Sequence, residues 1–439
     1  MQLIRGMTVL DTLFVWGELG CVTMPNISID HLEAGMKLAD AVLNPRGQVL
    51  IPEGTTIEPK HLRGLNAWGI KSVSVTLSSV PESVFESSGI TLLDESQIEA
   101  FITDFFVFNE NFKDEPFIEA LKKIAAERLG KNGVAETVQT SKDSLLAEPP
   151  EHIREKKPSI TIDELIEMTT NIATLPNIYF ELQNVMARPG SASSDLANAI
   201  RNDPGLTARL LRIVNSAYYS FPTKIETVPR AITIVGTDEL TSLVTATSVL
   251  KTFGSGLDAI FDMNTFWRHS IATGVMARIL GAKRNEQNIE RFFVMGLLHD
   301  IGRVLMFTHI PKHMRAALYR SSIEQIPLVQ VESDDIGFNH AAVGAALARS
   351  WRMAAGQQEA VSYHHRPSFA MRYKIEAAIT HIADILAHVI CVGQCPNGVA
   401  PPLDLEAWRQ LDLDVGILPA ILVEADQNIS ELVNIFFSE

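Results

Sequence analysis

The histidines of this 439-residue chain are concentrated in one part of its sequence. Nine of the twelve lie within the 120 positions from His269 to His388, little more than a quarter of the chain. Imidazole is the commonest metal ligand near neutral pH, and a helical scaffold can bring ligands from distant positions together. This concentration makes a metal site the first chemistry to consider.

One of these histidines, His299, is followed directly by Asp300 in an apolar stretch, Gly296-Leu-Leu-His-Asp-Ile-Gly302-Arg303. A carboxylate buried beside a histidine costs free energy unless it is paired or bound to a metal ion. Two interpretations remain open. The pair binds a metal ion, or it forms a structural hydrogen bond that joins two helices.

A metal ion needs more ligands than this pair supplies, so the others must come from different elements. The candidates are His269, His340, His364, His365 and Asp384. Four such groups suffice for one divalent ion. The additional histidines could hold a second ion bridged by Asp300, which would suit a hydroxide that attacks a phosphodiester.

The remaining histidines of this region are expected to have structural or surface positions rather than to bind metal. His309 and His313 are one helical turn apart, but a proline between them interrupts the turn, which favours an exposed surface. His381 and His388 are expected to be packing or surface residues. At least one member of the His364-His365 doublet is expected to face solvent.

The sequence of residues 160–390 predicts helix almost throughout, and therefore a mostly α fold class. Thr161 and Glu164 have the spacing of a capping box at a helix start. Asp203 before Pro204 is typical of an N-cap followed by an N1 proline. A second such start is predicted at Thr227.

The polar pair Asn215 and Ser216 ends one of these apolar helices. Their side chains could satisfy the free carbonyl groups of the last turn. The alternative is that this part of the helical region presents a docking face to a partner protein.

The rest of the chain divides into segments around this helical region. Residues 24–78 predict a small α+β domain, in which Val49–Ile51 returns as the second strand of a hairpin and Pro59 opens a helix. Residues 79–159 predict a connector, helical over 94–129 and then a mobile polar linker. Residues 391–439 predict a helical tail.

The first 23 residues are expected to be a flexible or non-native extension. The segment from Met7 to Val22 is fairly apolar, but Asp11 and Glu18 interrupt it, which argues against a signal peptide. Translation from Met24 is the alternative.

The composition excludes several function classes. A hydrophobic content of 46% is typical of a globular chain, and the net charge of −15 argues against a reader of duplex DNA. Three cysteines are too few for a disulfide framework and favour the cytoplasm. No apolar run reaches about 18 residues, so no membrane span is predicted.

Taken together, these motifs resemble the HD superfamily of metal-dependent phosphohydrolases, and residues 160–389 resemble its HDOD branch. Matching motifs flank the His-Asp pair on both sides. They are Leu175-Pro176, Asp203-Pro204-Gly-Leu-Thr, Val214-Asn-Ser-Ala, Ala231-Ile-Thr-Ile-Val-Gly236, Gly296-Leu-Leu-His-Asp-Ile-Gly302, Glu332 with Gly337-Phe-Asn-His340, Trp351, His364-His365 and Ala383-Asp384. The N-terminal unit is similar to the small domain that often precedes the related HD-GYP phosphodiesterases.

The resemblance implies a set of metal positions in this chain. They are His269, His299, Asp300, His340, His364, His365 and Asp384. Three departures argue against phosphodiesterase activity. Thr265 stands where HD-GYP enzymes with an extra metal carry an acidic residue, Arg303 replaces the usual lysine, and the Gly-Tyr-Pro loop after the histidine doublet is absent.

The resemblance therefore implies a bacterial, cytoplasmic signalling protein that acts through protein partners, with a remnant metal pocket that holds iron, manganese or a similar divalent ion. The alternative is an enzyme that cleaves a cyclic dinucleotide with these metals. In that case Asp300 and Arg303 are the candidate catalytic residues.

Overall fold

The computed structural model describes residues 26–437, except for 30–31, 39–40, 44–48, 53, 68–69, 71, 77–78, 80–89, 92, 136–156, 173–176, 189–192, 217, 220, 222, 254–261 and 394–398. Several predictions fall outside the described residues. These are the extension over residues 1–23, the alternative start at Met24 and most of the polar linker. Two of the three cysteines, Cys21 and Cys395, also lie outside the described residues.

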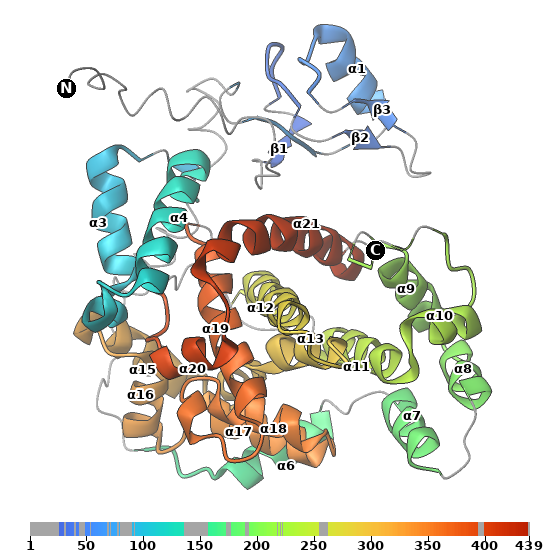
Figure 1. Ribbon diagram of the computed structural model, residues 1–439, viewed down its shortest axis with the longest axis vertical. Helices are drawn as coiled ribbons and strands as arrows, with labels where there is room; N and C mark the ends of the chain where they lie inside the picture. The colour runs from blue at the N-terminus through green and yellow to red at the C-terminus, as the bar shows by residue number, and fades with distance from the viewer. Residues whose placement is uncertain are drawn as a thin grey trace, which may run out of the picture.

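The N-terminal α+β part has a small core of its own (Figure 1). Strand β1 (Asn26–Ser28) pairs antiparallel with β4 (Ser72–Ser74), and β2 (Val42–Leu43) pairs antiparallel with β3 (Val49–Ile51). Helix α1 (Pro59–Ala67) lies between β3 and β4 in the chain. The predicted hairpin and the helix that opens at Pro59 are confirmed.

The connector forms a helical hairpin. Helix α3 (Glu95–Phe105), the 3-10 turn η3 (Val107–Phe112) and α4 (Pro116–Asn132) follow one another, and the short strands β5 (Ile90–Thr91) and β6 (Val134–Ala135) pair across its ends. The helices over residues 94–129 were expected from apolar spacing; the strand pair was not.

This connector packs on the C-terminal part of the chain. The fully buried Asn109 donates to Pro401 O at 3.0 Å and accepts from Leu403 N at 2.8 Å. Arg128 forms a two-pronged ion pair with Asp426 at 2.9 and 2.7 Å. These contacts bring segments together that are almost 300 positions apart in the sequence.

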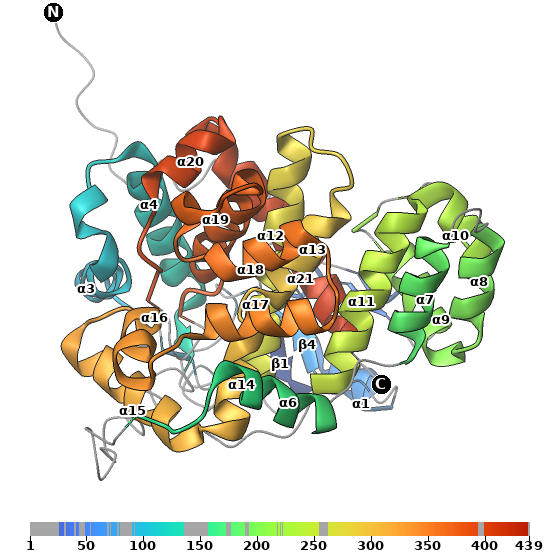
Figure 2. The ribbon, with the colours of Figure 1, turned by 90° about the horizontal axis from the view of Figure 1, so that it is seen from below.

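Most of the described residues between 157 and 390 lie in helices, which confirms the mostly α fold class. In chain order they are α6 (Ile162–Ile172), α7 (Asn177–Ala187), α8 (Ser193–Arg201), α9 (Pro204–Val214), α10 (Val228–Val235), α11 (Thr237–Phe253), α12 (Met263–Lys283), α13 (Glu290–Leu298), α14 (Ile301–His309), α15 (Pro311–Glu324), α16 (Leu328–Val331), the π-helical turn η4 (Glu332–Ile336), α17 (His340–Ser350), α18 (Ala355–Tyr363), the 3-10 turn η5 (Pro367–Phe369) and α19 (Lys374–Ile390). Helices α7 to α10 gather on one side, as Figure 2 shows.

The predicted helix starts are confirmed. Thr161 N donates to the Glu164 carboxylate at 2.8 Å, and Glu164 N donates to Thr161 Oγ1 at 3.3 Å. The Asp203 carboxylate accepts from Leu206 N at 2.9 Å. Thr227 caps α10 in the same way.

The polar pair at the end of α9 has a structural role. Asn215 Nδ2 donates to the carbonyl groups of Leu211 and Ile225, each at 2.7 Å, and Ser216 Oγ donates to Ile213 O at 2.5 Å. These bonds are those expected if the pair satisfies the end of an apolar helix.

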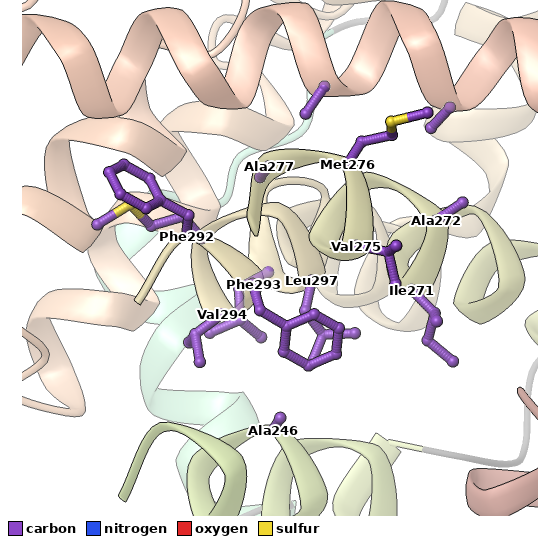
Figure 3. Packing of buried hydrophobic residues seen from close by; sticks show 14 of the residues in the cluster. Ala246, Ile271, Ala272, Val275, Met276, Ala277, Phe292, Phe293, Val294 and Leu297 are labelled. Carbon is purple, nitrogen blue, oxygen red and sulfur yellow. The ribbon is translucent and has the colours of Figure 1, made fainter. Parts of the chain in front are cut away.

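Helices α12 and α13 form the centre of the large core. Figure 3 shows Phe293 and Val294 directed from α13 toward Ala246 of α11, and Phe292 directed the other way. The two helices approach closely, because a Cβ atom on Gly296 of α13 would lie 2.6 Å from the backbone of Thr273. This close crossing places the end of α13 beside α12.

The C-terminal tail is helical, as predicted. Helix α20 (Leu405–Leu411), the 3-10 turn η6 (Val415–Ile417) and α21 (Leu418–Phe437) pack into the same core as α12 and α19. Within the described residues, no helix combines the length and apolar character that crossing a bilayer requires.

Candidate metal centre

Side chains from five helical segments converge on one buried place. His269 comes from α12, His299 and Asp300 from the turn between α13 and α14, and His340 from the first position of α17. The His364-His365 doublet follows α18. Asp384 and His388 lie one turn apart on α19. We call these eight residues the ligand cluster.

Asp300 lies at the centre of the ligand cluster. Its Oδ1 is 3.1 Å from His340 Nε2 and 3.5 Å from His364 Nε2. Its Oδ2 is 3.0 Å from Arg303 Nη1 and 3.5 Å from His299 Nε2. One carboxylate therefore faces histidines from three different elements.

Asp384 contacts three histidines on the other side of the cluster. Its Oδ1 lies 3.1 Å from His269 Nε2, 3.5 Å from His299 Nε2 and 3.1 Å from His388 Nδ1. The rings of His269 and His388 are 4.5 Å apart. His299 thus lies between the two carboxylates.

These atoms are buried, yet several lack a hydrogen-bond partner. His299, Asp300, His340, His364 and Asp384 are each at most 2% exposed. Among the described residues, no hydrogen bond reaches the orphaned atoms His299 Nε2, His364 Nε2, Asp300 Oδ1 and Asp384 Oδ1. A buried polar atom without a partner is costly, and here the orphaned atoms face one another. Cations bound at more than one place in the cluster would satisfy them.

The ring orientations also fit metal ligation. His299 Nδ1 lies 2.6 Å from Gly296 O, and His364 Nδ1 lies 2.7 Å from Val361 O. Since a carbonyl only accepts, each Nδ1 must carry a proton and donate, which leaves Nε2 of a neutral ring unprotonated and facing inward. This arrangement is typical of metal-binding histidines.

The ligand atoms form three overlapping groups, and within each the atoms all lie within 4.8 Å of one another. Asp300, His340, His364 and His365 make one group; His269, His299 and Asp300 make the second; His269, Asp384 and His388 make the third. Each group could hold a metal ion. We call the His269 side, with Asp384, the first metal position and the His340 side the second metal position.

Burial and neighbouring charges shift the pKa values of several groups in this cluster in opposite directions. Burial opposes the ionisation of Asp300, but Arg303 and His299 outweigh it and hold the pKa of the carboxyl well below its usual value. Burial also lowers the pKa of His340, but Glu332 and Asp300 raise it to about 9. The pKa of His269 falls to about 4, through burial and the neighbouring His388.

The structure brings together all seven side chains that the sequence predicted as metal ligands. Of the doublet, His364 is fully buried, whereas His365 is half-buried with its Nε2 2.8 Å from His340 Nε2. His365 therefore contacts the cluster while part of its surface stays accessible to solvent.

Two residues of this site were missed. His388 was expected to be a packing or surface residue, but it contacts Asp384 from the next turn of the same helix. The spacing of four residues could have revealed it. Glu332, fully buried, accepts from His340 Nδ1 at 2.6 Å. The sequence placed it in one motif with His340 but assigned it no role in the site.

His309, His313 and His381 are not part of the ligand cluster. His309 ends α14 and His313 lies in the first turn of α15, so Pro311 does break the turn. Both are half-buried rather than exposed, and His309 Nε2 lies 3.0 Å from Thr169 Oγ1. His381, expected to be a packing or surface residue, is buried, and its Nδ1 donates to His364 O at 2.7 Å.

Comparison with known protein families identifies most of the helical region that carries the site. The profile of the HDOD family matches residues 172–367, which carry His269, the His-Asp pair, His340 and the doublet. These residues form an HDOD domain. Asp384 and His388 lie beyond the matched HDOD residues, on α19.

One curated relative matches part of this chain. An uncharacterized protein of Treponema pallidum (strain Nichols) is 26% identical over 208 residues, which are 46% of this chain and 40% of that protein. The chain thus matches less than half of the relative's length.

Solved structures share the HDOD fold. An HDOD domain protein of unknown function from Geobacter sulfurreducens is 24% identical, with a TM-score of 0.50 over 63% of this chain and 98% of that one. A candidate phosphohydrolase from Shewanella amazonensis SB2B is 22% identical, with a TM-score of 0.50 over 62% of this chain and 97% of that one.

Proposed function

We propose that this chain is a signal-transduction regulator, in which the HDOD domain acts through protein partners and the ligand cluster holds divalent metal ions that organise it. The observation that carries this proposal is the enclosure of the ligands. His299, Asp300, His340 and His364 are at most 2% exposed. An enzyme that cleaves a phosphodiester must admit that group to its metal ions. Ligands so deeply buried favour a metal centre that shapes the domain.

The donor set suggests which ions would bind. His269, His299, Asp300 and Asp384 would hold the first ion, and His340, His364 and His365 would share Asp300 with the second. Imidazole suits iron and zinc, whereas carboxylate also suits manganese. The mixed set favours iron or manganese. When bound, such ions would replace the missing hydrogen bonds of the orphaned atoms.

The N-terminal part would supply the input to this module. We propose that residues 24–78 form a separate domain, because their buried side chains form a core apart from the large helical core. The proposed connector (79–159) packs against the proposed tail (391–439) through contacts such as Arg128 with Asp426. The tail contacts α9 of the HDOD domain, where Arg212 donates to Ile435 O at 2.7 Å.

A second function is favoured by one observation. Arg303 pairs with Asp300 at 3.0 Å and is 22% exposed, so a cation lies beside the carboxylate that both metal positions share. A guanidinium can bind a phosphate group. This placement would suit hydrolysis of a cyclic dinucleotide, in which Arg303 orients the phosphate and two ions supply a hydroxide.

Metal analysis and a phosphodiesterase assay on the same samples test the proposal. The proteins are the parent, the double variant His299→Ala with Asp300→Ala, and the control His313→Ala, which removes a half-buried histidine outside the cluster. We expect iron or manganese in the parent and the control, none in the double variant, and no turnover of cyclic dinucleotides by any of them.

Two results would contradict this expectation. Turnover by the parent and the control that disappears in the double variant would establish the hydrolase instead. A parent that holds no metal after growth with added iron and manganese would refute the metal centre.

A further inference from the structure

Glu332 is a buried carboxylate that the proposed metal positions do not include. It is fully buried, at the start of the π-helical turn η4. Its Oε2 accepts two hydrogen bonds from one residue, from His340 Nδ1 at 2.6 Å and from His340 N at 3.0 Å. Its Oε1 is buried and, among the described residues, has no hydrogen-bond partner. A carboxylate with one orphaned oxygen is costly for the fold alone.

The contact determines which nitrogen of His340 can act as a ligand. Because a carboxylate only accepts, the proton of the imidazole must lie on Nδ1. Nε2 then faces Asp300 Oδ1 at 3.1 Å and His365 Nε2 at 2.8 Å. These are the neighbours that a shared metal ion would have at the second position.

The surrounding backbone holds both partners of this contact. The π-helical turn ends at Gly337, whose φ of 97° lies in the left-handed region that glycine favours. Asn339 then caps α17, accepting from Ala342 N at 3.0 Å and donating to Ser333 Oγ at 3.1 Å. Short π-helical turns often occur at functional sites. Here the turn brings Glu332 to the first residue of the next helix.

We infer that Glu332 is a positioning residue for the second metal position, which fixes the orientation and tautomer of His340 so that Nε2 binds the ion. The inference rests on the metal centre of the proposed function. Partners of this kind on metal-binding histidines contribute about 10- to 100-fold in metal affinity. Glu332 acts only through His340, so the first metal position does not depend on it.

Titration with Mn²⁺, followed by the electron paramagnetic resonance signal of the free ion, tests this inference. The variants are Glu332→Ala, the conservative Glu332→Gln, His340→Ala and the double variant Glu332→Ala with His340→Ala. Glu290→Gln is the matched control, because Glu290 is also buried but pairs with Arg278 at 2.5 Å. Circular dichroism checks that each variant is folded.

We expect Glu332→Ala to weaken the second ion about 10- to 100-fold and leave the first unchanged. Glu332→Gln, whose amide oxygen can still accept from Nδ1, should lose less, and the control should bind as the parent does. In the His340→Ala background, the loss of Glu332 should have no further effect, because a residue that acts through another adds nothing once that other is gone. Should Glu332→Ala not fold, Glu332→Gln carries the same comparison.

Two different failures can be told apart. If the parent binds Mn²⁺ and both Glu332 variants bind it equally well, or if both ions weaken together, the positioning role is wrong while the metal centre stands. If the parent binds no Mn²⁺ even in excess metal, the metal centre itself is wrong, and the role of Glu332 falls with it.

Discussion

Replacing Gly302 with alanine should separate the helices that carry the two halves of the second metal position. Gly302 lies in the first turn of α14, just after Asp300, where the helix crosses α17. A Cβ atom there would lie 2.8 Å from Gly344 N and closer still to His340 O, whereas ordinary contacts begin at 3.4 Å. The neighbour is backbone, so it cannot rotate away.

The displacement can be estimated from these distances. Relief of the contact with Gly344 alone requires a shift of at least about 0.6 Å, and metal–ligand distances tolerate only about 0.2 Å. The shift moves Asp300 relative to His340, so we expect Gly302→Ala to lose the second ion. Overpacking of this kind also costs about 1–3 kcal/mol of stability.

Urea denaturation and metal analysis of the same preparation check both effects. The control is Gly130→Ala on α4, where a Cβ atom would make an ordinary contact of 3.5 Å with Ile98. That exposed helical site should gain about 0.4–1 kcal/mol. If Gly302→Ala is as stable as the parent and keeps both ions, the close crossing of α14 and α17 does not determine the site.

Three further predictions concern the pH dependence of metal affinity, the contribution of His388 to the first metal position, and the stability that the Arg128–Asp426 ion pair provides. Glu332 and Asp300 raise the pKa of metal-free His340 to about 9, so a proton must leave before Nε2 can bind metal. Metal affinity should therefore fall about tenfold for each pH unit below 9. Equilibrium dialysis at several pH values measures this affinity. His388→Ala removes a partner of Asp384 and should weaken the first ion by about tenfold in Mn²⁺ titrations. Arg128→Ala leaves Asp426 buried without its ion pair and should lower the free energy of unfolding in urea by about 3–5 kcal/mol. Equal metal affinity at pH 6 and pH 9 would contradict the first prediction. Binding of the first ion by His388→Ala with the parent's affinity would contradict the second. Unfolding of Arg128→Ala at the same urea concentration as the parent would contradict the third.

Local rules predicted most of the helices and the ligand types. Capping residues such as Thr161 and Asp203 mark helix starts because they satisfy backbone groups within three positions, so their signal is contained in a few neighbouring letters. The apolar setting of Asp300 likewise indicated a buried carboxylate that needs a partner.

The contacts that escaped prediction join distant or irregular segments. The bonds of Asn109 to Pro401 and Leu403 span almost 300 positions, and no local rule reaches that far. Glu332 meets His340 only because a π-helical turn bends the chain between them. His388 was accessible to helical spacing, but a histidine on an apolar helix has an equally simple packing interpretation.

The placement of α19 has a practical consequence for anyone who trims this protein. A fragment that stops at residue 367 would retain the entire HDOD match and every histidine of the second position. It would lose Asp384 and with it the acid that neutralises His269 and His299. Such a fragment would expose the apolar flank of α12 and lack one of the two carboxylates of the ligand cluster.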